Sequence, residues 1–216
     1  MSNALFERYR PKVWSDVVGQ EKALSLIDRW RRSGRLTGRA VWIVGNSGTG
    51  KTTIAQLLAD EVAEPSGVIE LDSRELTPHR VDELARSLKA GGLLKRGRVV
   101  IVNQPDGLRQ EAVSVLLTKL EQIPADGLWI FTATAESEDK FFQECLDGRS
   151  LWSRCVPLRL ARTGLSIAFA ERARFVAEQE GLGGKPPEAY SRLAQDCRNN
   201  LHAMLSEIES GAMLLD

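Results

Sequence analysis

The sequence predicts an α/β protein in which a three-layer domain with a five-stranded parallel sheet is followed by a small three-helix domain. Three observations lead to this prediction. Short apolar runs alternate with helical periods, a glycine-rich turn separates the first run from the helix that follows it, and the strand signal stops after Leu160. Continuous apolar runs are typical of strands buried in a parallel sheet. We expect the sheet domain at residues 1–162 and the helical domain at residues 163–216.

The predicted strands are short runs of apolar and β-branched residues. They are Val41–Val44, Val68–Leu71, Val99–Val102, Trp129–Ala133 and Val156–Leu160. Helices with one apolar face precede or join them, and these are Gln20–Arg32, Thr53–Val62, Val81–Leu88 and Glu111–Leu120. Such alternation predicts right-handed crossovers and helices on both faces of the sheet.

Three further helices are expected after the sheet. Their apolar spacing predicts the ranges Leu165–Glu180, Glu188–Cys197 and Asn200–Met213. A stretch rich in glycine and proline at residues 181–187 separates the first two, and a turn at Arg198-Asn199 separates the last two.

Composition and charge exclude some classes of function. Lys and Arg total 29 and Asp and Glu total 29, so any contact with nucleic acid would need a local basic patch. No run is long enough to span a membrane, and the N-terminus lacks the apolar core of a signal peptide. Cys145, Cys155 and Cys197 are far apart and lack metal-type spacing, which favours reduced thiols. We therefore expect a cytoplasmic protein without a membrane partner.

The glycine-rich turn between the first strand and its helix predicts a phosphate-binding loop, or P-loop. Its glycines Gly45, Gly48 and Gly50 let the backbone turn sharply and bring N–H groups onto phosphate oxygens. Lys51 is expected to reach the β and γ phosphates, and the hydroxyl of Thr52 to bind Mg²⁺. A plain glycine-rich turn is the alternative. The expected ATP or ADP contacts are Asn46, Ser47, Gly48, Thr49, Gly50, Lys51, Thr52 and Thr53.

Four motifs, in order along the chain, together resemble one family. Arg8-Tyr9-Arg10-Pro11 and Val17-Val18-Gly19-Gln20 precede the P-loop, while Ser153-Arg154-Cys155 and Asp196-Cys197-Arg198-Asn199-Asn200-Leu201 follow it. This set resembles the AAA+ clamp-loader ATPases, such as replication factor C small subunits and the tau-gamma and delta-prime subunits of bacterial DNA polymerase III. The resemblance implies a P-loop AAA+ domain with a helical lid, acting in DNA replication or repair.

The resemblance assigns roles to residues outside the P-loop. Arg10 and Pro11 belong to the nucleotide-binding entry segment, and Val17 and Val18 would pack against adenine, although a simple core contact is an equal alternative. Thr134 falls at sensor 1, which reads the γ-phosphate; its alternative is a plain strand end.

Two arginines complete the expected site. Arg154 would cross to the nucleotide of a neighbouring AAA+ subunit, identical or different, and stabilise charge on the γ-phosphoryl group. Arg198 would touch the γ-phosphate of its own subunit and couple the lid to the nucleotide state. Surface positions without a role in catalysis are the alternatives for both.

The third strand departs from the family pattern, which places Asp-Glu (Walker B) directly after the apolar residues. Here the chain reads Asn103-Gln104. Asn103 retains an oxygen that can accept from a Mg²⁺-bound water, but the Gln104 amide is no general base at neutral pH. We therefore expect nucleotide binding with weak or absent hydrolysis. The pair fits either a natural degenerate subunit or a deliberate trapping substitution.

Other expectations concern partners. Arg109, near the start of the helix after the third strand, is the candidate DNA-phosphate contact, with a solvated surface arginine as the alternative. Lys89, Lys95, Arg96 and Arg98 form a second basic group. The collar domain and the zinc-binding cysteines found in the family have no counterpart up to Asp216. An ATP-driven clamp-loader-like module is the first hypothesis, and an inactive regulatory or scaffold subunit the second; a P-loop kinase fits less well.

Overall fold

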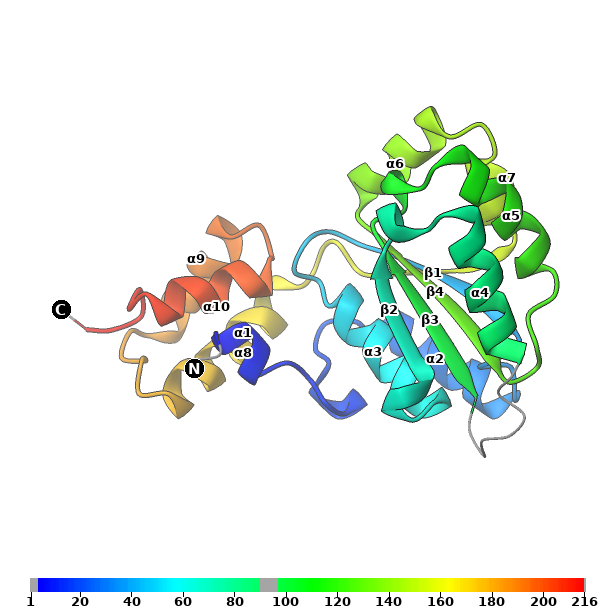
Figure 1. Cartoon of the computed structure of the whole chain (residues 1–216). Helices are drawn as coiled ribbons and strands as arrows, with labels where there is room; N and C mark the ends of the chain where they lie inside the picture. The colour runs from blue at the N-terminus through cyan, green and yellow to red at the C-terminus, as the bar shows by residue number, and fades with distance from the viewer. Residues whose placement is uncertain (1–3, 90–96, 216) are drawn as a thin grey trace.

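In the computed structural model, residues 4–89 and 97–215 are described, and they form a sheet domain beside a smaller helical domain (Figure 1). The sheet contains β1 (Arg39–Val44), β2 (Val68–Asp72), β3 (Arg98–Asn103), β4 (Gly127–Ala133) and β5 (Cys155–Arg159). Their order is β2-β3-β4-β1-β5, and every neighbouring pair is parallel. The predicted five-stranded parallel sheet is confirmed, and each predicted strand lies within one residue or two of its observed limits.

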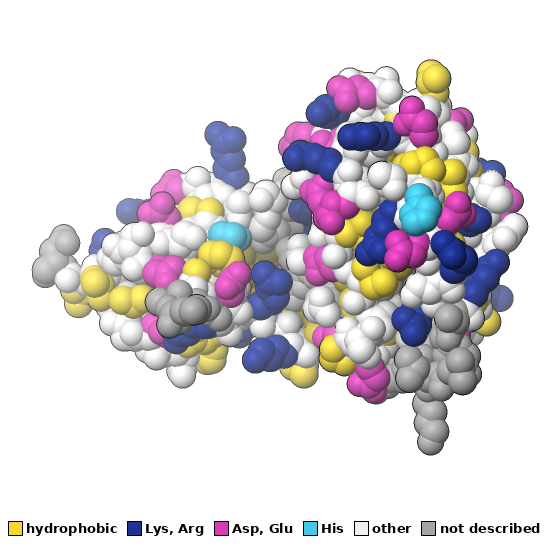
Figure 2. All heavy atoms as spheres, viewed as in Figure 1, with side chains coloured by type: hydrophobic (Ala, Val, Ile, Leu, Met, Phe, Trp, Pro, Cys, Tyr) yellow, Lys and Arg dark blue, Asp and Glu magenta, His cyan; other side chains and the backbone are white. Residues whose placement is uncertain are grey.

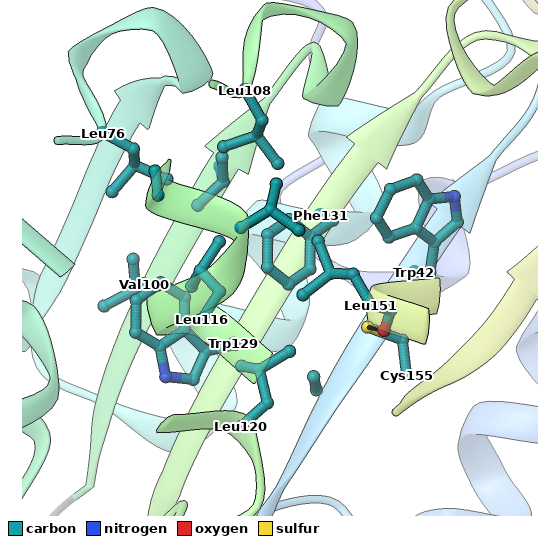
Figure 3. Packing of buried hydrophobic residues seen from close by; sticks show 14 of the residues in the cluster. Trp42, Leu76, Val100, Leu108, Leu116, Leu120, Trp129, Phe131, Leu151 and Cys155 are labelled. Carbon is teal, nitrogen blue, oxygen red and sulfur yellow. Dashed lines mark hydrogen bonds between the residues drawn. The ribbon is translucent and has the colours of Figure 1, made fainter. Parts of the chain in front are cut away.

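Side chains alternate between the two faces of the sheet, as the pleat requires. From β1, Val41 and Ile43 pack under α2 (Glu21–Arg32) and α3 (Lys51–Val62). Trp42 of the same strand enters the opposite layer, where its ring lies 5.4 Å from that of Phe131. That layer is covered by α4 (Pro78–Lys89) and α5 (Gln110–Leu120), with α6 (Ala135–Glu144) and α7 (Gly148–Ser153) beside them (Figure 3). Burial of both faces explains the continuous apolar strands.

The helical domain consists of α8 (Ser166–Gln179), α9 (Pro187–Asp196) and α10 (Leu201–Glu209). The prediction extended the last helix to Met213, but it ends at Glu209, where the chain turns through Gly211 with φ +89°. The short helix α1 (Leu5–Arg8) packs on this domain, because Leu5 is buried in the same core as Phe169 of α8. The N-terminal segment therefore crosses from the helical domain to the sheet domain. The division at residue 162 stays a prediction.

Charge is distributed evenly over the face seen in Figure 2, where basic and acidic side chains are interspersed on both domains. Within the described residues, no helix is long and apolar enough to cross a membrane. Of the second basic group, Lys95 and Arg96 lie outside the described residues, while Arg98 donates to Ser87 Oγ at 3.2 Å.

Candidate functional site

The P-loop leaves β1 and enters α3 at the carboxyl edge of the sheet. Gly45 N donates to Ala133 O at 3.3 Å, which holds the start of the loop against the end of β4. Gly50, with φ +95°, precedes the first turn of α3. Since the first N–H groups of a helix have no partners within it, Lys51, Thr52 and the loop direct donors toward one point. This is the local geometry of an anion-binding site.

A pocket of about 290 Å³ opens at this point, between the loop, the N-terminal segment and the helical domain. It is lined by Arg10, Pro11, Val17 and Val18 and by the whole run from Ser47 to Thr53. Two residues expected to bind nucleotide, Asn46 and Arg198, are not among its lining residues. Residues with no role assigned from the sequence complete the wall, and two of them, Tyr9 and Leu201, belong to the motifs quoted above. The set is Phe6, Tyr9, Asp16, Phe169, Arg172, Leu201, His202 and Leu205.

The added residues make one end of the pocket apolar and aromatic. Phe6 and His202 stack with ring centroids 3.6 Å apart, joining α1 to α10. Val17 packs against the core under α2 and α3, Val18 packs against the core of the helical domain, and both line the same pocket. A pocket with donors at one end and flat or branched apolar side chains at the other suits a ligand with a phosphate chain and a planar base.

Lys51 is held inside the loop by the chain itself. Its Nζ donates to Asn46 O at 2.7 Å, and Thr49 Oγ1 donates to the same carbonyl at 2.8 Å. Burial lowers the pKa of Lys51 to about 8, and the negative charge of Glu136 partly opposes this shift. A phosphate would offer Lys51 a charged acceptor and relieve the cost of its buried charge. Asn46 therefore positions Lys51 through its carbonyl oxygen.

Gln20 ties the loop to the connection between the domains. Its side chain is 1% exposed, and it donates through Nε2 to Thr49 O at 3.2 Å. Its Oε1 accepts from Ala161 N at 2.7 Å, just after β5. Both ends of a buried amide are thus used in linking the P-loop to the segment that leads into α8. The preceding Gly19, with φ +72°, packs against Leu165 at the start of that helix.

The end of β3 carries the altered motif. Asn103 Nδ2 donates to Glu70 Oε1 at 2.8 Å, and its Oδ1 accepts from Thr132 Oγ1 at 2.5 Å. Gln104 is exposed and has φ 55°, and its carbonyl accepts from Ser73 Oγ. Thr134 follows β4 and caps α6 by accepting from Ser137 N at 3.0 Å. This cap uses a lone pair of the hydroxyl rather than its hydrogen.

Arg154 lies at the amino ends of the strands, whereas the P-loop lies at their carboxyl ends. It directly precedes β5, whose first residue, Cys155, pairs with Ala40 near the start of β1, while the P-loop follows the end of β1. Five strand residues at about 3.3 Å each separate these edges. Arg154 donates to Glu121 Oε1 at 2.9 and 2.7 Å and to Ser150 O at 2.9 Å. It therefore cannot reach the P-loop of its own chain.

The two remaining expected site residues, Arg198 and Arg109, are exposed. Arg198 and Asn199 have φ 51° and 56°, which gives the predicted turn between α9 and α10 a left-handed backbone. Asn199 is tied to α8, because its Oδ1 accepts from Ser166 Oγ at 2.8 Å. Arg109 immediately precedes α5. The roles of Arg198 and Arg109 stay predictions.

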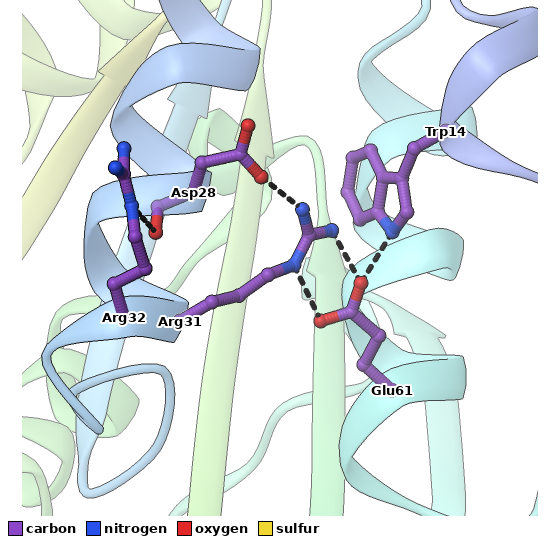
Figure 4. Close-up of polar contacts among 5 residues, drawn as sticks. All are labelled: Trp14, Asp28, Arg31, Arg32 and Glu61. Atoms are coloured by element: carbon purple, nitrogen blue, oxygen red, sulfur yellow. Dashed lines mark hydrogen bonds and ion pairs between the residues drawn. The ribbon is translucent and has the colours of Figure 1, made fainter.

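A polar cluster fixes the segment that carries Val17 and Val18 (Figure 4). The Arg31 guanidinium binds both oxygens of Glu61, with Nε to Oε2 at 2.9 Å, and contacts Asp28. Trp14 Nε1 also donates to Glu61, and the indole ring lies 4.6 Å from the Arg31 guanidinium carbon. Three elements, the N-terminal segment, α2 and α3, are thus joined, and the joined segment continues to the pocket residues Val17 and Val18.

Comparisons with known proteins connect this geometry to a fold family. A family model described as ABC transporter matches residues 36–140, slightly less than half of the chain, and this range includes the P-loop. Replication factor C small subunit 1 of Pyrobaculum arsenaticum is 27% identical over 185 residues, which cover 82% of this chain and 52% of that protein. The replication factor C small subunit of Methanoregula boonei is 24% identical over 218 residues, or 96% of this chain and 63% of that protein.

The solved structure of the Thermotoga maritima RuvB Holliday junction branch migration motor matches 93% of this chain and 64% of its own with a TM-score of 0.68 at 19% identity. A variant of that RuvB reaches a TM-score of 0.71. At such identity the likeness shows the fold alone. The chain spans between about half and two thirds of the length of these curated relatives and solved chains. The protein therefore has the P-loop AAA+ fold, and its replication factor C relatives confirm the resemblance to the clamp-loader AAA+ ATPases.

Proposed function

We propose that this chain is an ATP-binding, clamp-loader-like AAA+ module that acts in DNA replication or repair, in the cytosol, as a nucleotide-driven conformational switch. The observation that carries the proposal is the pocket, because it draws its walls from the P-loop, the N-terminal segment and the helical domain together. A ligand that fills it touches both domains and can therefore change the angle between them.

The residues of the pocket fit ATP. The phosphates would lie on the N–H groups of the loop and the first turn of α3, and Lys51 would exchange the Asn46 carbonyl for a phosphate oxygen. The base would lie toward Val17, Val18 and the aromatic end. Arg198 would sense the γ-phosphate when the lid closes.

The oxygen donors near the loop also fit Mg²⁺, which prefers oxygen ligands and keeps several waters. Thr52 supplies a hydroxyl beside the phosphate site, and Asn103 supplies an amide oxygen at the end of β3. When bound, Mg²⁺ would neutralise part of the phosphate charge.

Hydrolysis is proposed to be weak or absent. The strand end that needs a carboxylate base presents Gln104, whose amide takes up no proton at neutral pH. Gln104 can orient a water, and Thr134 would contact the γ-phosphate as a donor. Losing a general base typically costs about 10²–10⁴-fold in rate.

A regulatory or scaffold subunit is the second candidate, and Asn103 with Gln104 favours it. In this version bound nucleotide only sets the lid angle for partner binding. Both versions include neighbouring AAA+ subunits, since Arg154 lies at the edge of the sheet opposite the P-loop and would act on a neighbour's nucleotide. Arg109 is the proposed DNA contact.

Calorimetry of Mg²⁺-ATP binding tests the proposal. The wild-type chain is expected to bind, Lys51→Ala to lose binding, and Lys22→Ala, a change of an exposed lysine on α2, to leave it intact. Absence of wild-type binding would overturn both candidates. ATP turnover with and without primed DNA separates them: steady turnover that is lost in Lys51→Ala and Arg154→Ala rules out the regulatory subunit.

A further inference from the structure

Three polar side chains on neighbouring strands form a continuous chain at the carboxyl edge of the sheet. Glu70 lies on β2, Asn103 on β3 and Thr132 on β4. Their positions alternate with the residues that enter the layer under α4 and α5, so all three lie on the face that α3 covers. On this sheet β4 is the strand between β3 and the P-loop strand β1.

The negative charge of Glu70 fixes the direction of both hydrogen bonds that join Glu70, Asn103 and Thr132. An ionised carboxylate only accepts, so the atom of Asn103 that faces Glu70 must be Nδ2, which donates at 2.8 Å. The other end of the amide is then Oδ1, which accepts from Thr132 Oγ1 at 2.5 Å. The ambiguity between oxygen and nitrogen that usually affects asparagine is absent here. The amide oxygen thus points toward β4, the P-loop side.

The same contact makes aspartate unsuitable at position 103. A carboxylate there would meet the Glu70 carboxylate at hydrogen-bond distance with no hydrogen between them. Two carboxylates that share a site cannot both ionise without cost, and the pKa of one rises. The pair therefore works as a donor and an acceptor: the Asn103 amide on β3 donates, and the Glu70 carboxylate on β2 accepts.

We propose that Glu70 is a positioning residue for Asn103, and that it holds the amide oxygen toward the Mg²⁺-nucleotide site while carrying the negative charge that the end of β3 lacks. This role rests on the proposed function, because it concerns how Asn103 meets the nucleotide. It also implies that restoring Asp-Glu on β3 by Asn103→Asp and Gln104→Glu is insufficient unless Glu70 is neutralised as well.

The binding test compares the ATP dissociation constant in EDTA with that in Mg²⁺ for Glu70→Gln, Asn103→Asp and the double variant. Glutamine can donate or accept, so it lets the Asn103 amide turn, and the ratio of the two constants should fall about threefold or more in Glu70→Gln. The double variant should recover the wild-type ratio, since aspartate presents an oxygen in either orientation. Glu111→Gln, on α5 at the opposite face, should match the wild type.

Urea unfolding tests the pairing without nucleotide. At pH 7 Asn103→Asp should unfold at a lower urea concentration than the double variant. Its folding equilibrium constant should be about tenfold smaller for each unit by which repulsion raises a carboxyl pKa. The proposal is overturned if Glu70→Gln keeps the wild-type ratio or if Asn103→Asp is as stable as the double variant. If the wild type binds no ATP, the proposed function fails, and so does the role of Glu70 toward nucleotide; the urea comparison then decides on the pairing alone.

Discussion

Asn200, just before α10, occupies the space that a side chain at Gly48 of the P-loop would need. A Cβ built on Gly48 would lie 1.8 Å from Asn200 Oδ1. The same oxygen accepts from Ala203 N at 3.1 Å and so caps α10. The helical domain therefore approaches the loop through an atom that also caps one of its own helices.

Gly48→Ala should separate the two domains and weaken ATP binding strongly. The methyl group meets Asn200, and φ +71° adds backbone strain of about 1–2 kcal/mol. Gly181→Ala is the matched control, since φ is +67° there and nothing lies within 4 Å. Small-angle X-ray scattering and ATP titration measure the two effects. Equal behaviour of the two variants would mean that strain alone, rather than the contact with Asn200, is responsible.

Binding of ATP should take up a proton above pH 8. The pKa of Lys51 is about 8 in the fold, below its usual 10.5, because burial disfavours the charged form. The buried charge of Lys51 destabilises the folded state fully below pH 8, and this cost disappears as the pH rises toward 10.5. Phosphate restores the charge, so at pH 8.5 the binding enthalpy should depend on the ionisation enthalpy of the buffer. At pH 7 Lys51 is already protonated and this dependence should vanish; identical enthalpies in two buffers at pH 8.5 contradict the prediction.

Gln20→Ala should destabilise the protein by about 1–3 kcal/mol, because Thr49 O and Ala161 N lose a buried partner. Urea unfolding measures this loss. The exposed Gln122→Ala should stay within about 0.5 kcal/mol of the wild type. A similarly small change in Gln20→Ala would show that water replaces the amide at no cost.

Glu61→Gln should weaken ATP binding about fivefold, or roughly 1 kcal/mol, and leave inorganic tripolyphosphate unaffected. The change removes the charge that holds Arg31 and Trp14, and so loosens the segment bearing Val17 and Val18. Competition binding with both ligands measures the difference. Asp60→Asn on the same helix is the control, since asparagine can still accept from Gln56 Nε2. Equal losses for both ligands would place the effect on the P-loop instead.

The sequence predicted the sheet well because β1, β3 and β4 are buried on both faces and all five strands are short apolar runs bounded by turns or helices. Val99–Val102 is an example: its four consecutive apolar residues alternate between the two buried layers, as a strand with both faces covered requires. Helices α6 and α7 were missed, because α6 begins with acidic residues and buries only Glu138 and Phe141. Their apolar period is too sparse to detect.

The pocket was predicted in part, for a similar reason. The P-loop residues are consecutive, so their spacing alone identifies them, whereas Phe169 and His202 come from helices whose packing the sequence does not specify. Gln20 stands inside a motif that had been noted, yet its two buried contacts join segments 29 and 141 residues away. Glu70 carried no local signal, since its partner is on another strand.

Arg154 and the P-loop stand at opposite ends of the same parallel strands, which gives each subunit a direction. A contact in which Arg154 of one copy meets the nucleotide of the next joins unlike surfaces, and the two ends of such a pair stay unsatisfied. A two-fold dimer brings the same surface of both copies together, so it could not place Arg154 of each copy against the P-loop of the other. The role proposed for Arg154 would therefore require head-to-tail assembly, in which the rotation between successive subunits decides whether a closed ring or an open helix results.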